Sequence, residues 1–254
     1  MLVAIASIKG SPGVTTLVVG LAAQWPRPRP AVVFECDPAG GDLTARFGLA
    51  GAPSLVDVAA EARRGRGVDL ERHVQALPGG VALVPAPTAA EQARAALAAL
   101  DHGGWLPLRQ VASRYAVIVD CGRWDGDSPS TGLLRMADVA LLVARPEPAD
   151  VARLHARLPI IGGWSGRVGL VLRAAPGYAA ADVSEALSVP VTVTVPDDPR
   201  GAAVLSGQAT SRRGLSRLPL LRAAGALAIG IANQDCQTPN AAVQRRNAPA
   251  RVVS

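Results

Sequence analysis

Short apolar runs rich in Val and Ile recur along almost the whole chain, and none of them alternates cleanly with polar residues. Strands that are buried on both faces show this pattern, whereas a strand with one wet face alternates. The runs occupy residues 2–8, 31–36, 81–85, 115–120, 139–144, 168–172 and 191–195. Helical patterns separate most of them, so we predict an α/β fold with a mostly parallel, twisted sheet of about seven strands and helices on both faces.

The predicted helices are read from spacing and from capping residues. Leu17, Leu21 and Trp25 recur at every fourth position after the first run, which places them on one helical face. Thr88 and Glu91 have the spacing of a capping box and predict a helix that begins there and runs to about residue 100. Further helices are predicted at residues 54–64, 182–187 and 218–232.

Length and composition favour one globular domain. The chain has 254 residues, of which 49% are hydrophobic and only 3% aromatic, so Ala, Val and Leu must form the core. Periodicity persists to about residue 232 and is lost in the polar and basic segment after it. We therefore predict one domain over residues 1–232 and a disordered tail over residues 233–254.

The first run ends in a glycine-containing loop that opens directly into a helix. Residues 9–16 read KGSPGVTT, and Lys9 is the one lysine among 26 basic residues. Gly10 and Gly13 allow the backbone to turn with its amides pointing inward, and the helix start adds unpaired N–H groups. Thr15 offers a hydroxyl to a magnesium ion. The loop therefore predicts a phosphate site, with an ordinary strand-to-helix turn as the alternative.

Two other runs end in acids. Residues 31–36 lead into Asp37, and residues 115–120 end in Asp120. A carboxylate at the end of a buried strand is unfavourable unless a cation lies nearby. Because the carboxyl ends of parallel strands meet at one edge of the sheet, both acids should lie beside the loop. A bound metal–phosphate group would satisfy them.

This set of segments resembles the MinD/ParA family of P-loop ATPases, whose deviant Walker A loop reads KGGxGKT[ST]. Residues 37–42 resemble its second acidic motif, and residues 115–120 resemble its Walker B strand. Residues 137–148 and 195–207 resemble two later segments of the family. The resemblance covers roughly residues 1–232 and implies a Rossmann-like P-loop NTPase fold.

The resemblance also implies roles for matching positions. Lys9 would be the signature lysine that reaches phosphates bound by a partner subunit, and Asp37 would polarise the attacking water, which makes these two the catalytic candidates. Magnesium would be held directly or through water by Thr15, Asp37 and Asp120. ATP and Mg²⁺ are the implied cofactors. The implied nucleotide-binding residues are Lys9, Gly10, Ser11, Pro12, Gly13, Val14, Thr15 and Thr16.

Val14 departs from the family pattern, because the P-loop lysine normally stands at this position. That lysine is a point charge on the β- and γ-phosphates, and valine supplies only its backbone amide. Two hypotheses follow. Lys9, with help from an arginine such as Arg123 or Arg173, supports a slow ATPase; or the chain is a pseudo-ATPase that keeps the fold as a scaffold. We expect nucleotide binding with weak or absent hydrolysis.

Three smaller departures accompany Val14. Glu35 replaces the first acid of the family's acidic pair, and Leu172-Arg173 stands where an asparagine often reads adenine. The segment after Asp120 also differs from the family's usual sequence. The identity of the base is therefore left open.

The resemblance suggests a nucleotide-dependent homodimer that regulates chromosome or plasmid partitioning, division-site placement, or pilus and secretion assembly. The alternative from another class is a protein-interaction scaffold that no longer uses nucleotide. In either case the protein partner is not identified by the sequence. A membrane-binding C-terminal helix is not expected, because residues 218–232 have little polar face.

The remaining features receive weaker interpretations. The net charge of +6 permits non-specific DNA binding, although a solvated basic face is the simpler reading. Cys36, Cys121 and Cys236 lack the spacing of a zinc site or a disulfide framework, as expected for reduced cysteines in a cytoplasmic protein, and Cys36 and Cys121 are interpreted as buried small side chains. The candidate DNA contacts are Arg212, Arg213, Arg217, Arg222, Arg245 and Arg246.

Overall fold

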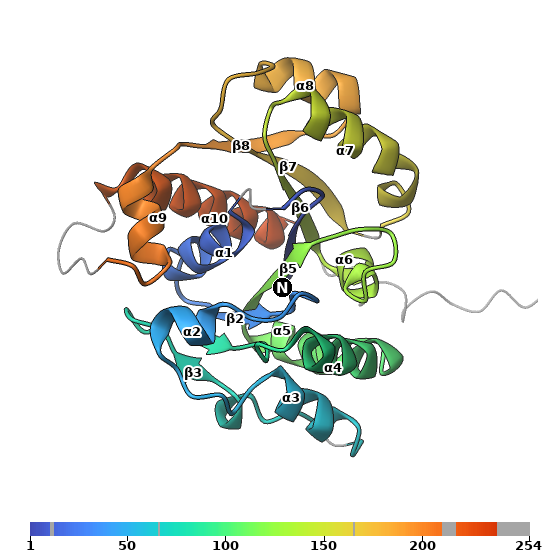
Figure 1. Ribbon diagram of the computed structural model, residues 1–254, viewed down its shortest axis with the longest axis vertical. Coiled ribbons are helices and arrows are strands. Elements are labelled where there is room, and N and C mark those ends of the chain that lie inside the picture. Colours follow the sequence, from blue (N-terminus) through green and yellow to red (C-terminus); the bar gives the residue numbers. More distant parts are fainter. Residues whose placement is uncertain (11–12, 66, 165, 210–216, 238–254) are drawn as a thin grey trace, which may run out of the picture.

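The computed structural model describes residues 1–10, 13–65, 67–164, 166–209 and 217–237. Its described residues form an eight-stranded sheet in the order β3-β4-β2-β5-β1-β6-β7-β8 (Figure 1). Every pairing is parallel except that of β3 with β4 at one edge. The strands are β1 (Leu2–Ser7), β2 (Ala31–Glu35), β3 (Gln75–Ala76), β4 (Ala82–Val84), β5 (Ala116–Arg123), β6 (Val139–Ala144), β7 (Arg167–Arg173) and β8 (Val191–Val195).

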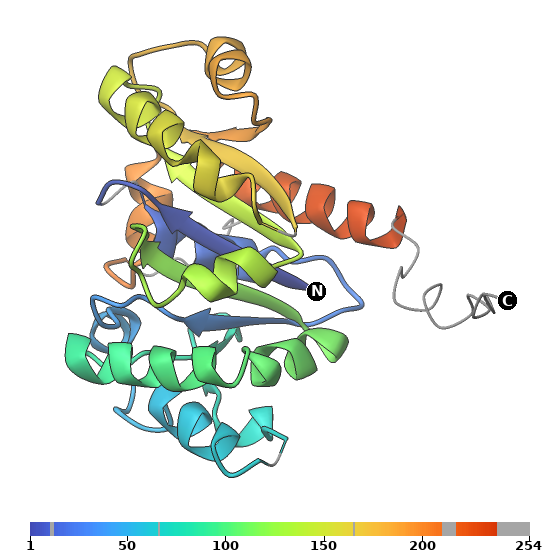
Figure 2. The same cartoon turned by 90° about the vertical axis from the view of Figure 1, so that its right-hand side faces the viewer.

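Helices cover both faces of the sheet (Figures 1 and 2). On one side α1 and α10 pack against each other, and α10 also contacts β8. The other side is covered by a longer series of helices that includes α4 to α8. The helices are α1 (Val14–Ala23), α2 (Leu43–Phe47), α3 (Leu55–Ala62), α4 (Ala90–His102), α5 (Leu106–Arg114), α6 (Thr131–Met136), α7 (Pro148–Ile161), α8 (Ala180–Leu187), α9 (Pro199–Leu205), α10 (Pro219–Gln237) and the short 3₁₀ helix η1 (Leu70–Arg72).

The central strand β1 shows why its sequence does not alternate. Leu2 and Ala4 belong to the apolar cluster under α4 to α8, whereas Val3 and Ile5 belong to the cluster under α1 and α10. All four side chains are fully buried. Successive residues of a strand face opposite sides of the sheet, so both sides of β1 must be apolar. The predicted α/β fold with a mostly parallel sheet is confirmed.

The structure corrects several element boundaries. The capping box predicted at Thr88 is wrong: α4 begins at Ala90, and its N-cap residue Ala89 makes no side-chain bond. A capping box is found instead on α3, where Ser54 caps the helix and Asp57 bonds back to the Ser54 amide. Thr88 is exposed, and its carbonyl lies against Gly40, so the loop after β2 occupies the space beside it.

Two ends of the fold also differ from expectation. The edge strand β3 was not predicted, because two residues carry no readable periodicity. Helix α10 continues to Gln237, beyond the end predicted at residue 232. The rest of the predicted tail, residues 238–254, lies outside the described residues and stays a prediction.

Strand β5 extends past Asp120, where the sequence had predicted its end. The register between β1 and β5 shifts between Ile5, which faces Asp120, and Ser7, which faces Arg123. One extra residue of β5 is accommodated at this bulge, and Gly122 there has a φ of 57°. Bulges re-aim nearby side chains and are frequent beside functional sites. Asp120 therefore lies inside the strand, directly before its irregular end.

Candidate functional site

The loop after β1 has the backbone that its glycines predict. Gly13 occupies the N-cap position of α1 with a φ of 94°, which is the left-handed region that only glycine adopts without strain. Gly13 itself has no side chain to cap the helix, and the first turn carries no acid. Amides at such a helix start can donate to a bound anion. Ser11 and Pro12, two of the predicted binding residues, lie outside the described part of the chain.

Asp37 and Asp120 meet at the same edge of the sheet as this loop. Glu35 pairs in register with Asp120 across β2 and β5, so Asp37 follows two residues beyond that pairing. The Asp37 carboxylate lies against Gly122: a Cβ built on Gly122 would be 2.0 Å from Asp37 Oδ2. Asp37 Oδ1 accepts a hydrogen bond from the Ala39 amide at 2.8 Å. The predicted convergence of these two acids is therefore observed.

Asp120 is the most perturbed carboxyl of this edge. It is fully buried, and burial raises its pKa to about 7 against the lowering effects of the Thr15 side chain and the Gly122 amide. Its Oδ1 accepts from Gly122 N at 2.9 Å, but the buried Oδ2 has no partner at hydrogen-bond geometry within the described residues. An unsatisfied buried carboxylate oxygen beside a threonine hydroxyl has the chemistry of a ligand for a hard cation or its water shell.

Val14 is the first residue of α1, and its side chain is buried in the apolar cluster that lies under α1 and α10. Only 4% of it is exposed. It therefore supplies packing rather than charge to this end of the loop. Thr15 and Thr16 are half-buried and follow it in the first turn.

Glu35 has a structural role that the sequence did not reveal. Its Oε1 accepts hydrogen bonds from the amides of Asp42 at 2.8 Å and Leu43 at 3.1 Å, and its Oε2 accepts from Ala86 at 3.0 Å. The side chain is buried, and desolvation raises its pKa despite these bonds. Glu35 thus fixes the loop that carries Asp37 and ties it to the segment after β4. The hydrogen bonds from these three amides explain why an acid stands at position 35, without any contact to a ligand.

Lys9 meets an acid that the sequence did not single out. Its ammonium is 3.8 Å from Oδ1 of Asp150, which lies in the first turn of α7. The Lys9 side chain is 45% exposed, whereas that of Asp150 is 6% exposed. Residues 9 and 150 are far apart in sequence, so only the sheet order, which sets β6 beside β1, brings them together. In the sequence, Asp150 is marked only as an acid in the first helical turn after a strand. Such acids are too common to identify this one as the partner of Lys9.

A small cavity of about 150 Å³ adjoins the loop. Gly13, Thr16 and Leu17 form one wall, and residues at the ends of β6, β7 and β8 form the others. Arg173 lines it and donates a hydrogen bond to Asp197 at 2.8 Å. Of the two arginines proposed to assist the loop, Arg173 therefore lies beside it. Arg123 is exposed at the end of β5.

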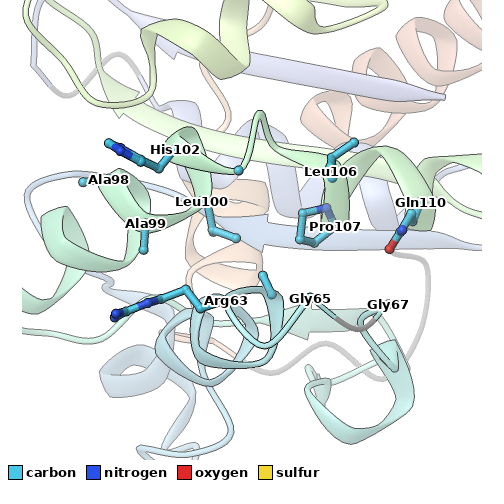
Figure 3. A pocket seen from close by; sticks show the side chains of 12 residues that line it. Arg63, Gly65, Gly67, Ala98, Ala99, Leu100, His102, Leu106, Pro107 and Gln110 are labelled. Atoms are coloured by element: carbon cyan, nitrogen blue, oxygen red, sulfur yellow. The ribbon is translucent and has the colours of Figure 1, made fainter.

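A larger cavity of about 610 Å³ lies elsewhere, between α3, α4 and α5 (Figure 3). Arg63, Ala99 and Pro107 are among its lining residues, and the loop residues and strand-end acids are not. Size alone does not identify the functional site here, since the chemistry is concentrated at the sheet edge.

The two cysteines at this edge are buried side chains. Cys36 and Cys121 are free and buried, and desolvation raises the pKa of both thiols well above the usual value. The interpretation as buried small side chains is thus confirmed for the thiols themselves. Within the described residues no three His, Cys, Asp or Glu side chains form a metal-binding group, and no helix is long and apolar enough to cross a membrane.

Comparisons with known proteins place the fold. No family model and no curated protein matches the chain. Among solved structures, the cell division ATPase MinD of Pyrococcus furiosus is similar with a TM-score of 0.70 and 19% identity, over 91% of this chain and 98% of that one. A ParA family ATPase from Chlorobium tepidum gives 0.69 and 18%, over 90% and 98%.

A third similar structure is MinD of Pyrococcus horikoshii, solved in complex with Mg-ADP. Its TM-score is 0.67 at 18% identity, over 94% of this chain and 98% of that one. All three similarities span nearly the whole of both chains. The chain therefore has the fold of the MinD/ParA ATPases.

Proposed function

We propose that this protein binds a magnesium–nucleoside triphosphate, ATP by resemblance, and acts as a nucleotide-dependent dimerising regulator of partitioning, division-site placement, or pilus and secretion assembly. The observation that carries the proposal is the buried Asp120 Oδ2, which has no hydrogen-bond partner among the described residues and belongs to a carboxyl group near Thr15 at the start of α1. A metal–phosphate group offers this oxygen a cation and offers the amides of α1 an anion.

The residues present fit such a group. Gly10 has nothing within 4 Å of the place of a Cβ, and Gly13 has the left-handed backbone that turns the loop into α1. Thr15, Asp37 and Asp120 would hold magnesium directly or through water, and the ion would neutralise charge on the phosphates. The cavity beside Thr16 and Leu17 is of a size suited to a base ring, which would lie there once the phosphates occupied the loop.

The proposal includes weak or absent hydrolysis. Val14 places no charge on the phosphates, and Lys9 stands at the opposite end of the loop beside Asp150. Loss of one preorganised charge from a dry active site typically costs on the order of 3 kcal/mol of transition-state stabilisation, or about 100-fold in rate. Asp37 would orient the attacking water, so slow turnover remains within the proposal.

Light scattering coupled to gel filtration tests the dimerisation. We expect 1 mM ATP with Mg²⁺ to shift the wild type from monomer toward dimer, and we expect Lys9→Ala to prevent the shift because it removes the charge that reaches the partner's phosphates. Arg94→Ala, which removes an exposed cation from α4 away from the loop, is the control. A wild type that stays monomeric at millimolar MgATP would contradict the proposal.

The second candidate is a scaffold that uses the fold without nucleotide. It is favoured by Val14, whose apolar side chain packs into the core where the family places a phosphate-binding lysine. The scaffold predicts that a protein partner, once identified, binds Lys9→Ala as tightly as the wild type and ignores added MgATP. Loss of the partner on this substitution would favour the nucleotide-dependent regulator.

A further inference from the structure

Asp150 is a buried carboxylate with an incomplete set of partners. Only 5% of the residue is exposed. Its Oδ2 accepts a hydrogen bond from the Arg145 amide at 3.1 Å, which ties the start of α7 to the end of β6. Its Oδ1 is buried and has no hydrogen-bond partner in the described part of the chain. A carboxylate in such a place is costly unless a cation compensates it.

Two cations face this oxygen, and neither is at hydrogen-bond distance. Lys9 Nζ lies at 3.8 Å, from the end of β1, and Arg153 Nη1 lies at 4.0 Å, from the next turn of α7. Both cationic side chains are about half exposed. Because Arg153 and Asp150 belong to the same helix, their pairing does not depend on the loop. The Lys9 contact, in contrast, joins the phosphate loop to α7.

We propose that Asp150 is the resting counterion of Lys9 and competes with nucleotide phosphate for its ammonium. The inference rests on the proposed function, since it names the residue that controls the loop's one lysine. In the absence of nucleotide, Asp150 holds Lys9 toward α7 and away from any phosphate bound by another subunit. When Lys9 moves to a phosphate, Arg153 remains to compensate Asp150, so the exchange leaves no buried charge unpaired.

The size of the competition follows from the exposure of Lys9. Partly exposed ion pairs are worth only a fraction of a kilocalorie to about one kilocalorie, so the need to break this pair on binding should cost the wild type about two- to fivefold in nucleotide affinity. Asp150→Asn keeps the shape of the side chain and an oxygen for the Arg145 amide, and it removes only the charge. We therefore expect this variant to bind MgATP about two- to fivefold more tightly than the wild type.

A double-mutant cycle separates this effect from a structural one. Calorimetry of MgATP binding is compared for the wild type, Asp150→Asn, Lys9→Gln and the double variant, each checked for a native circular dichroism spectrum and melting curve. The gain from Asp150→Asn should vanish in the Lys9→Gln background. The matched control is Asp182→Asn, which removes an exposed acid from the first turn of α8 and should change nothing. A gain that persists without Lys9 would overturn the proposal.

The single lysine also allows a test that needs no nucleotide. Protein labelled with ¹³C-lysine gives one Hε–Cε resonance, that of Lys9. The chemical shift of this resonance should change in Asp150→Asn and stay the same in Asp182→Asn. An unchanged chemical shift in Asp150→Asn would refute the ion pair even if ATP binds. If the wild type gives no heat with MgATP, the proposed function and the competition fall together, while the nucleotide-free spectrum still decides whether Asp150 holds Lys9.

Discussion

Some residues at this edge of the sheet can be identified from the sequence, and others are recognised only when the fold shows their contacts. Asp37, Asp120 and Thr15 were predictable because residues at the ends of parallel strands must meet at one edge. Asp150 was not, since its contact with Lys9 depends on the neighbouring places of β1 and β6 in the sheet. The structural use of Glu35 was also hidden, because its three amide partners come from loops whose path no local pattern specifies.

Gly122 should not tolerate a side chain. Its φ of 57° is strained for other residues, and a Cβ would lie 2.0 Å from the Asp37 carboxylate. We expect Gly122→Ala to destabilise the fold by about 1–3 kcal/mol and to displace Asp37 from the site. Urea unfolding measures the stability, with Gly48→Ala as the control, because Gly48 has a φ of 61° and open space around it. An equal loss in both variants would mean that strain, not the Asp37 contact, is decisive.

Asp120 should make stability depend on pH near neutrality. Its folded pKa of about 7 lies above the ordinary value of 3.8, so the folded state favours the protonated form. This contribution is fully present below about pH 3.8 and is lost as the pH rises through about 7. Between pH 5 and pH 8, in the absence of magnesium and nucleotide, we expect the free energy of unfolding to fall by on the order of 2 kcal/mol. Asp120→Asn should lack this component, and parallel pH profiles for the two proteins would contradict the assignment.

At the scale of elements, the sequence located seven of the eight described strands and misjudged where some elements begin and end. Buried parallel strands are recognisable in the sequence as apolar runs, whereas β3 has only two residues and forms no such run. Capping boxes are less reliable, because Thr88 and Ser54 have equivalent local patterns. Only Ser54 has an extended backbone followed by a helix at the next residue, and its side chain is within reach of the Val56 amide.

Substitutions at Ser54 and Thr88 form a matched pair. Ser54→Ala should cost about 1 kcal/mol, because it removes a side chain that accepts from the Val56 amide and takes part in the capping box. Thr88→Ala should change stability by less than about 0.5 kcal/mol, since Thr88 is exposed and caps no helix. Both values can be measured by urea unfolding. A larger loss from Thr88→Ala than from Ser54→Ala would show that α4, not α3, depends on the capping box.

The whole molecule has the fold of the MinD/ParA ATPases, and the loop after β1 carries Lys9 at one end and leads into α1 at Val14. The sheet order, the glycine at the start of α1 and the convergence of Asp37 with Asp120 are all present. Under the proposed function, these features would hold a metal–phosphate group. Val14 packs into the apolar cluster that lies under α1 and α10 and brings no charge to the loop. The fold and the charged residues of the loop would thus contribute separately to nucleotide binding, so binding should be measured in variants that change one and leave the other intact.

Calorimetric titration with MgATP tests the central claim most directly, in the wild type beside Val14→Lys and Asp120→Asn. We predict that the wild type binds in the micromolar range and that Asp120→Asn weakens binding at least tenfold, because it removes the buried carboxylate that would hold the magnesium shell. Val14→Lys should bind more tightly than the wild type, since a cation on the β- and γ-phosphates is restored. Binding by Val14→Lys alone, with no heat from the wild type, would contradict the account and identify the protein as a scaffold that keeps the fold without using nucleotide.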